Sequence, residues 1–315
     1  MNNFIHSSAD LITSHEQTRA GFIEAALEKN KKAQPYIEAA RTLKTIASEA
    51  ESPMDLLDMP QIMSGLLTAS GLSDKSLQYF SDENKLEAVR KMIEQFLVPA
   101  GEYWADELVY RYLLIKGDAL GGSMRNFVGA VAKIKVTRKV LSVLLNMGID
   151  YSVLTRRNKD SNSWASMSYA SDYESAEEIC ALSWKFDNRD KVLFFDSKVP
   201  IVNKNIDICL FQGTPLTYDS GEIVKKDGLA IMFGELKGGI DPAGADEHWK
   251  TANTALARIR SAFNNKIKTS FVGAAIEKNM ANEIYEQLKN GVLNNAANLT
   301  NEEQFTDYCK WIITL

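Results

Sequence analysis

Hydrophobic residues recur at intervals of three and four through the first 120 residues, which is the spacing of amphipathic helices. Glycine and proline are sparse in this part of the chain, and the main interruptions are Ser52-Pro53 and the GLSD stretch that begins at Gly71. The pattern therefore predicts an N-terminal all-helical domain. Its clearest examples are three stretches, FIEAALEKN (22–30), YIEAARTLKTIA (36–47) and KLEAVRKMIEQFL (85–97).

The pattern changes after the glycine-rich segment GDALGGSMRN, residues 117–126. Its glycines indicate a turn between two domains, and a further helix is predicted over 127–148, ending at a glycine. An alternative is that the segment sets Arg125 and its backbone N–H groups against a DNA phosphate or near an active site. We therefore expect a helical domain over 1–120 and a second domain over 121–315.

Short apolar runs typical of strands dominate the second half of the chain. Polar loops are expected over 156–172, followed by a helix that carries Glu177 and Glu178. A predicted crossover helix between strands implies a mixed sheet covered on both faces, so the fold class is α/β with an added helical domain. The expected order is strands over 191–197, 205–212 and 229–238, a helix over 245–263, a strand over 268–276, and helices around 280–290 and 301–312.

Three ionisable residues stand out because they interrupt predicted strands. Asp207 lies within the apolar run 206–211, where an ionised carboxylate is costly unless it is paired or binds a metal. Glu235 and Lys237 are one residue apart, so their side chains share one face of their strand. If the two strands are neighbours, the three side chains converge. Flanking glycines leave room for another backbone, such as that of a nucleic acid, and these are Gly234, Gly238 and Gly239.

This combination of residues suits metal-assisted hydrolysis of a phosphodiester. The carboxylates of Asp207 and Glu235, with the main-chain carbonyl of Leu236, are hard oxygen ligands of the kind that Mg²⁺ prefers. The ion would polarise the scissile phosphate and activate a bound water. Lys237 would orient that water or stabilise charge on the phosphate oxygens. The alternative is a structural ion pair at a sheet edge, because a Glu-x-Lys sequence alone is common on protein surfaces.

Charge is distributed unevenly along the chain. The segment 124–159 carries a net charge of +7 within a chain whose total is −5, so the remainder carries −12. A segregated basic segment is typical of a protein with one phosphate-facing surface, and Lys133 and Lys135 are candidates for phosphate contacts. The alternative is a solvated basic helix face beside an acidic one.

Composition limits where the protein works. No stretch approaches the roughly 20 apolar residues of a membrane-spanning helix, and the first 17 residues do not resemble a secretory signal. The three cysteines are odd in number and widely spaced, which argues against a disulfide framework or a zinc site. We therefore expect a cytoplasmic protein with no membrane partner.

The arrangement of Asp207 with Glu235-Leu236-Lys237 resembles the signature of PD-(D/E)XK nucleases, with Ile206 where that signature often has proline. More narrowly, the chain resembles the AvaI/BsoBI group of type II restriction endonucleases over most of its length. The segments that carry this resemblance are GDALGGSMRN, NIDICLF and GELKGGIDPAGADEHWKTA.

The resemblance implies roles for several residues. Asp207, Glu235 and Lys237 match the catalytic acids and lysine, and His248 matches an active-site histidine near the attacking water. Asp241 falls where the group presents side chains to base edges, and a carboxylate there accepts a hydrogen bond from cytosine N4. A residue that probes the minor groove corresponds to Lys75.

A restriction-endonuclease-like fold and a magnesium-dependent, site-specific deoxyribonuclease are what the resemblance implies. It also implies homodimers that encircle double-stranded DNA, cut at CYCGRG and leave 5′-phosphates, with the helical domain contributing to encirclement and dimer contacts. A cognate DNA methyltransferase would be a functional rather than a physical partner. The same pattern also serves structure-specific repair and junction-resolving nucleases. A non-catalytic DNA-binding protein is a further alternative, which the intact Asp, Glu and Lys set disfavours.

Overall fold

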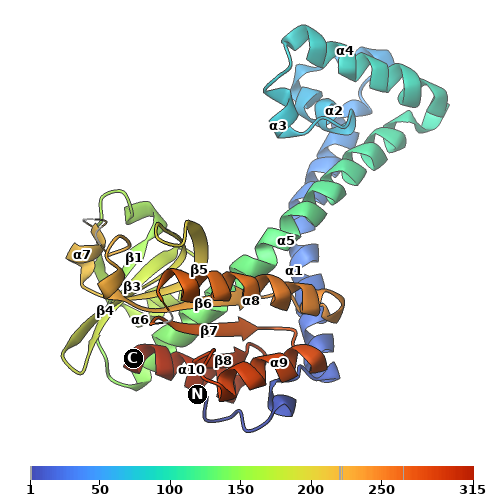
Figure 1. Ribbon diagram of the computed structural model, residues 1–315. Helices are drawn as coiled ribbons and strands as arrows, with labels where there is room; N and C mark the ends of the chain where they lie inside the picture. The colour runs from blue at the N-terminus through green and yellow to red at the C-terminus, as the bar shows by residue number, and fades with distance from the viewer. Residues whose placement is uncertain (1, 220, 222, 265) are drawn as a thin grey trace. The chain divides into compact units, whose positions relative to one another are not determined.

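An eight-stranded mixed sheet organises the larger of two structural units in the computed structural model (Figure 1). The structure describes residues 2–219, 221, 223–264 and 266–315. The strand order is β2-β1-β3-β4-β5-β6-β7-β8. The strands are β1 (Tyr151–Thr155), β2 (Ala165–Ser166), β3 (Ile179–Phe186), β4 (Arg189–Val199), β5 (Lys204–Gln212), β6 (Ala230–Lys237), β7 (Lys268–Gly273) and β8 (Asn295–Asn298).

The sheet changes from antiparallel to parallel at β6. Pairs from β2 to β6 are antiparallel, whereas β6–β7 and β7–β8 are parallel. Parallel neighbours need crossover connections, and these are α8 (Ala245–Ala262) and α9 (Lys278–Lys289). The predicted mixed sheet flanked by helices is confirmed.

Helices cover both faces of the sheet because its central strands alternate two sets of apolar side chains. On one face, Phe211 and Phe233 belong to the same buried cluster as Trp249 of α8 and Ile284 of α9. On the other face, residues such as Leu210 and Met232 pack in a second cluster with the C-terminal part of α5 (Trp104–Asn146) and with α10 (Glu302–Thr314). The sheet is therefore buried on both faces, and this packing fixes the positions of its strand ends.

A second unit, residues 24–126, is helical and has its own core. Its fully buried side chains include Leu56, Leu66, Val89, Leu97 and Leu108. The helical character predicted for the N-terminal region is confirmed. We call this part the helical unit and call residues 1–23 with 127–315 the sheet unit. The helical unit contains most of α1 (His15–Ala47), then α2 (Met63–Ala69), α3 (Asp74–Leu77), α4 (Asp82–Met92) and the start of α5.

The glycine-rich segment 117–126, predicted to be a turn, lies inside the long helix α5. Added Cβ atoms at Gly117, Gly121 and Gly122 would meet nothing within 4 Å, so these glycines mark no change in packing. Apolar side chains recur on both sides of the segment, and burying them outweighs the helix penalty of about 1 kcal/mol per glycine. The two units divide within α1 and α5, at 23/24 and 126/127, whereas the sequence suggested a boundary near 120.

Strands β1, β2, β3 and β8 were not predicted, and the helix expected around Glu177 and Glu178 is wrong. A short helix, α6 (Tyr169–Glu174), lies before these glutamates, and β3 begins at Ile179 after a turn. None of the helices that the structure describes is long and apolar enough to span a membrane.

Residues from the N-terminus complete the sheet unit. The buried amide of Asn2 donates to the carbonyls of Ala296 (3.1 Å) and Gln304 (2.7 Å). Asn298 of β8 donates in turn to the carbonyl of Leu11 at 3.0 Å. Buried amides are costly without partners, so these bonds fix the N-terminal segment against the β8 edge. This explains why residues 1–23 belong to the sheet unit although they precede the helical unit in the chain.

The expectation that glycines beside the Glu–Lys pair leave room for nucleic acid is wrong at Gly234 and Gly238. A Cβ on Gly238 would lie 2.5 Å from Cβ of Ala132 and 2.7 Å from the carbonyl oxygen of Val128, both in α5. A Cβ on Gly234 would lie 2.5 Å from the hydroxyl of Ser270. The protein itself occupies this space, and Gly238 allows α5 to contact the end of β6.

Replacing Gly238 by alanine should destabilise the sheet unit by about 1–3 kcal/mol, because α5 backbone blocks the added methyl group. Gly239→Ala is the matched control, since its nearest neighbour would lie at 3.7 Å, an ordinary contact. Urea unfolding followed by the fluorescence of the five tryptophans, four of which lie in the sheet unit, measures both. Equal midpoints for the two variants would contradict the packing described here.

Candidate active site

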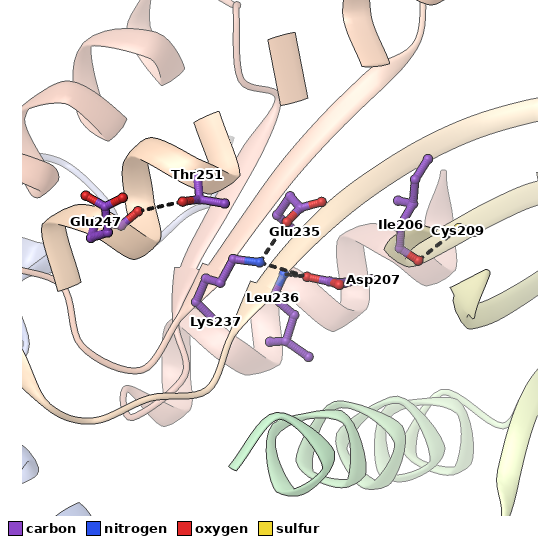
Figure 2. A network of polar contacts seen from close by, with 8 residues as sticks. All are labelled: Ile206, Asp207, Cys209, Glu235, Leu236, Lys237, Glu247 and Thr251. Carbon is purple, nitrogen blue, oxygen red and sulfur yellow. Dashed lines mark hydrogen bonds and ion pairs between the residues drawn. The ribbon is translucent and has the colours of Figure 1, made fainter. Parts of the chain in front are cut away.

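Asp207 lies where β5 and β6 stop pairing with each other. The last regular pair on this side is Ile208 with Gly234. Beyond it, the Asp207 carboxylate accepts the backbone N–H of Leu236 at 2.8 Å, in place of a ladder bond (Figure 2). This bond orients the carboxylate toward the end of β6.

Lys237 joins two carboxylates. Its ammonium donates to Glu235 Oε2 at 2.8 Å and to Asp207 Oδ2 at 3.3 Å (Figure 2). The side chains of Glu235, Lys237 and Asp207 are 7%, 24% and 29% exposed, so the group is largely shielded yet reachable from solvent. The structure thus brings together the three residues that the strand pattern singled out, and we call them the Asp–Glu–Lys trio.

Burial shifts the proton equilibria of the trio. Burial, followed by the negative charge of Asp207, raises the pKa of Glu235 to about 7, although Lys237 opposes both effects. For Lys237, burial lowers the pKa, but the two carboxylates outweigh that effect and the net pKa is raised. Lys237 is therefore protonated at neutral pH, and one ammonium does not fully compensate two carboxylates.

The donor set fits a small divalent cation. Two carboxylates surround one positive charge, and the peptide N–H of Leu236 faces β5, so the carbonyl of the same strand residue faces β5 too. Within the described ranges, no third His, Cys, Asp or Glu side chain joins the pair to form a metal-binding group. Magnesium commonly takes one or two carboxylates and completes its shell with water and substrate oxygens, so the fit is adequate.

His248 follows Lys237 by eleven residues in the sequence. Within the described residues it makes no hydrogen bond to the Asp–Glu–Lys trio. It is exposed on the first turn of α8. Its Nε2 would be 3.4 Å from a Cβ on Gly244 and 3.7 Å from one on Gly239, so the ring packs over the loop that follows β6. Gly239 is only two residues beyond Lys237, which leaves the imidazole near the end of β6.

Asp241 is exposed and caps the short helix Pro242–Gly244. Its Oδ1 accepts the N–H of Ala243 at 3.0 Å. A carboxylate has about four acceptor sites, so this bond leaves capacity to accept hydrogen bonds from a ligand. This bond to Ala243 holds the Asp241 side chain at the start of the helix Pro242–Gly244.

Lys133 does not lie on an open surface. Its side chain is 10% exposed and its ammonium is 3.6 Å from the carboxylate of Asp196. Burial lowers the pKa of Lys133, and Asp196 only partly offsets this. A phosphate contact of Lys133 would therefore share its ammonium with Asp196 or replace that ion pair.

Asp196 was not predicted from the sequence, although it lies next to Asp207. Both residues fall between the pairs Phe195–Ile208 and Ser197–Ile206, so they oppose each other on β4 and β5. Asp196 has φ of 50°, which is uncommon for a residue other than glycine. A single aspartate near the end of an apolar strand offers no sequence signal for this backbone conformation.

The remaining candidates lie elsewhere. Lys75 is exposed on α3 in the helical unit, and Lys135 is exposed on α5 in the sheet unit. The side chain of Arg125 falls outside the described residues. Two other basic residues of α5 already have protein partners: Arg138 donates to the carbonyl of Tyr173, and Lys139 pairs with Glu302.

Comparison with known proteins places this geometry in context. A model of the family described as restriction endonuclease BsobI matches residues 1–315. The type II restriction enzyme BsoBI of Geobacillus stearothermophilus is 48% identical over 99% of this chain and 98% of its own length. The type II restriction enzymes AvaI of Nostoc sp. (strain PCC 7120) and of Anabaena variabilis are each 47% identical, with the same coverage.

About half of the positions differ from each of these relatives, so the chain is distinct from both BsoBI and AvaI. The match nevertheless runs through both structural units and includes the strands that carry the Asp–Glu–Lys trio. The chain therefore belongs to the BsoBI family of type II restriction endonucleases.

Proposed function

We propose that the protein cuts double-stranded DNA at a short specific sequence by magnesium-dependent hydrolysis and leaves 5′-phosphate ends. The convergence of Asp207, Glu235 and Lys237 where β5 and β6 part is the observation that carries the proposal. Membership of a restriction endonuclease family supports DNA as the substrate. By resemblance, the recognised sequence is CYCGRG.

Each member of the trio has a distinct task in this proposal. Asp207 and Glu235, with the carbonyl of Leu236, hold the ion, and the Leu236 N–H keeps Asp207 oriented toward it. Magnesium, when bound, supplies polarisation of the scissile phosphate and acidification of a water molecule. Lys237 has a raised pKa and is therefore a cation rather than a base, so its role is to stabilise charge on the phosphate oxygens.

That assignment leaves the proton of the attacking water to another group. His248 is exposed, lies over Gly239 and Gly244, and belongs to the helix that directly follows the catalytic strand and its loop. An imidazole is suited to accept or position a proton near neutral pH. We assign His248 to that role, and Asp241 on the same loop to a hydrogen bond with a cytosine amino group.

The partners follow from the reaction. A palindromic site is matched by two-fold protein symmetry, so the proposal includes a homodimer. The proposed DNA contacts are Lys75 in the minor groove and three basic residues on the DNA phosphate backbone, Arg125, Lys133 and Lys135. The phosphate contacts contribute affinity rather than sequence information. The proposal also includes a cytoplasmic location and a cognate DNA methyltransferase that protects the host's own sites.

Cleavage of a long linear DNA of known sequence tests the function. With magnesium, we expect discrete fragments whose ends map to CYCGRG and join to one another with ligase, because the 5′-phosphates are present. A chelator should abolish cutting. Smeared products, or cleavage only at branched DNA, would favour a repair or junction-resolving nuclease, and no cutting would favour a DNA-binding protein.

Lys237→Ala should still bind a duplex that contains the site in the presence of calcium, because the carboxylates remain. Its cleavage rate with magnesium should fall on the order of 100- to 1,000-fold, as expected on loss of a charge-stabilising group. Gel-shift and single-turnover cleavage assays measure the two effects. Lys310→Ala, an exposed lysine of α10, is the control and should match the wild type. Normal cleavage by Lys237→Ala would refute this mechanism.

Calcium binding to the free protein should strengthen about tenfold between pH 6 and pH 8. Glu235 has a pKa of about 7, so at pH 6 it is mostly protonated and must lose its proton to bind the ion, whereas at pH 8 it is already ionised. Titration calorimetry at pH 6 in two buffers of different ionisation enthalpy should register proton release.

Glu235→Gln should weaken calcium binding and abolish its pH dependence. Glu286→Gln, an exposed carboxylate on α9, is the matched control and should behave as the wild type. A pH dependence that survives in Glu235→Gln would show that another group releases the proton.

A further inference from the structure

The loop between β6 and α8 packs directly on the backbone of helix α1. A Cβ on Gly21 of α1 would lie 2.4 Å from Cγ1 of Ile240 and 3.1 Å from both its Cβ and its Cδ1. The close approach involves the inner atoms of the isoleucine as well as its tip. A methyl group on Gly21 would clash with Cγ1 of Ile240, and Cβ of Ile240, which no side-chain rotation moves, is close enough that the loop would have to shift by a few tenths of an ångström.

The start of α1 is firmly held. Just before the helix, the Thr13 hydroxyl donates to the carbonyl of Ala274 and accepts the N–H of Ile276, both at 2.9 Å, immediately after β7. Within the first turn, the amide of Gln17 donates to the carbonyl of Thr300 at 3.2 Å. Gly21 therefore belongs to a helix segment tied to the same end of the sheet at which the catalytic strand finishes.

The other side of the loop is held as well. Gly238 contacts Val128 and Ala132 of α5, as described above. Between this contact and the Asp241 cap on Ala243, the chain has only Gly239 and Ile240. Ile240 is consequently the one large side chain in this two-residue stretch, and its contact with Gly21 sets the distance between the loop and α1.

We propose that Ile240, seated on Gly21, is a positioning residue that sets where Asp241 meets its base, and that it thereby determines specificity. The inference rests on the proposed base contact of Asp241. Direct readout needs hydrogen bonds with donor–acceptor distances of about 2.7–3.2 Å, and a group displaced by about 0.5 Å is already outside productive geometry. Ile240 is bonded to Asp241, so a shift of one moves the other.

The presence of glycine at position 21 supports this reading. Glycine destabilises a helix interior relative to alanine, so helix formation alone does not account for it. Gly129 in α5 provides the contrast, because a Cβ there would meet nothing within 4 Å. The two positions differ in what they contact, which makes them a matched pair for substitution.

Gly21→Ala, Ile240→Ala, the double variant of these two and Gly129→Ala test the proposal. The measurement is the ratio of kcat/KM for a cognate duplex to that for a duplex with one changed base pair. We expect Gly21→Ala and Ile240→Ala each to lower this ratio by about tenfold or more, the range associated with losing one base contact. Gly129→Ala should stay within about twofold, and the double variant should lose less than the product of the two single losses, because the added methyl clashes with the side chain that Ile240→Ala removes.

Other outcomes would overturn the proposal. An unchanged ratio in Gly21→Ala would show that the contact does not govern recognition. An equal loss of rate on both duplexes would show damage to the site as a whole, and losses that simply multiply in the double variant would show that Gly21 and Ile240 act independently. Circular dichroism of every variant excludes misfolding as the cause.

Asp241→Ala, which removes the hydrogen-bond acceptor, distinguishes failure of the positioning role from failure of the nuclease function. If the wild type cuts discrete sites but Asp241→Ala keeps the full ratio, then Asp241 reads no base and the positioning role fails with it, while the nuclease function stands. If the wild type itself gives no discrete fragments, the proposed function fails before the role of Ile240 is addressed.

Discussion

Two carboxylates share one ammonium at the point where β5 and β6 part, and this shortage of positive charge constrains the rest of the site. Glu235 is nearly buried, so its ionised form is stable only beside a cation. The hydrogen-bond ladder between β5 and β6 stops at the pair Ile208–Gly234. The Leu236 N–H therefore has no main-chain acceptor on β5 and donates to the Asp207 carboxylate instead. Packing on both faces of the sheet holds the strands at that separation.

Strand periodicity was enough to predict the trio, because alternation places Glu235 and Lys237 on one face whatever surrounds them. It was not enough for β8, whose sequence NAAN has low strand propensity and pairs only because β7 lies beside it. The helix prediction before β3 was wrong because there a helix-like composition gave way to a strand. Glutamates and alanine suggested a helix there, yet tertiary packing buries the residues from Ile179 onward in a strand.

Glycines and lysines were harder still, since their meaning depends on what lies opposite. Gly238 suggested open space for a nucleic acid, and the structure has α5 there. Lys133 of α5 suggested an exposed phosphate contact, and its side chain is largely buried beside Asp196 of β4. In both cases the partner comes from another part of the chain, so composition and spacing contain no information about it. The resemblance to a known family gave the recognition chemistry that residue patterns could not.

The hydrogen bonds from Asn2 to Ala296 and Gln304 connect residues about 300 positions apart, so they have a consequence for synthesis on the ribosome. The helical unit is continuous in sequence and has its own core, whereas the sheet unit needs both its first segment and its last helix. Domains generally fold as units in the order in which they emerge. A nascent chain thus presents its helical part early, while Asn2 has neither of these partners until Ala296 and Gln304 have been synthesised, so the sheet unit is completed after the helical unit.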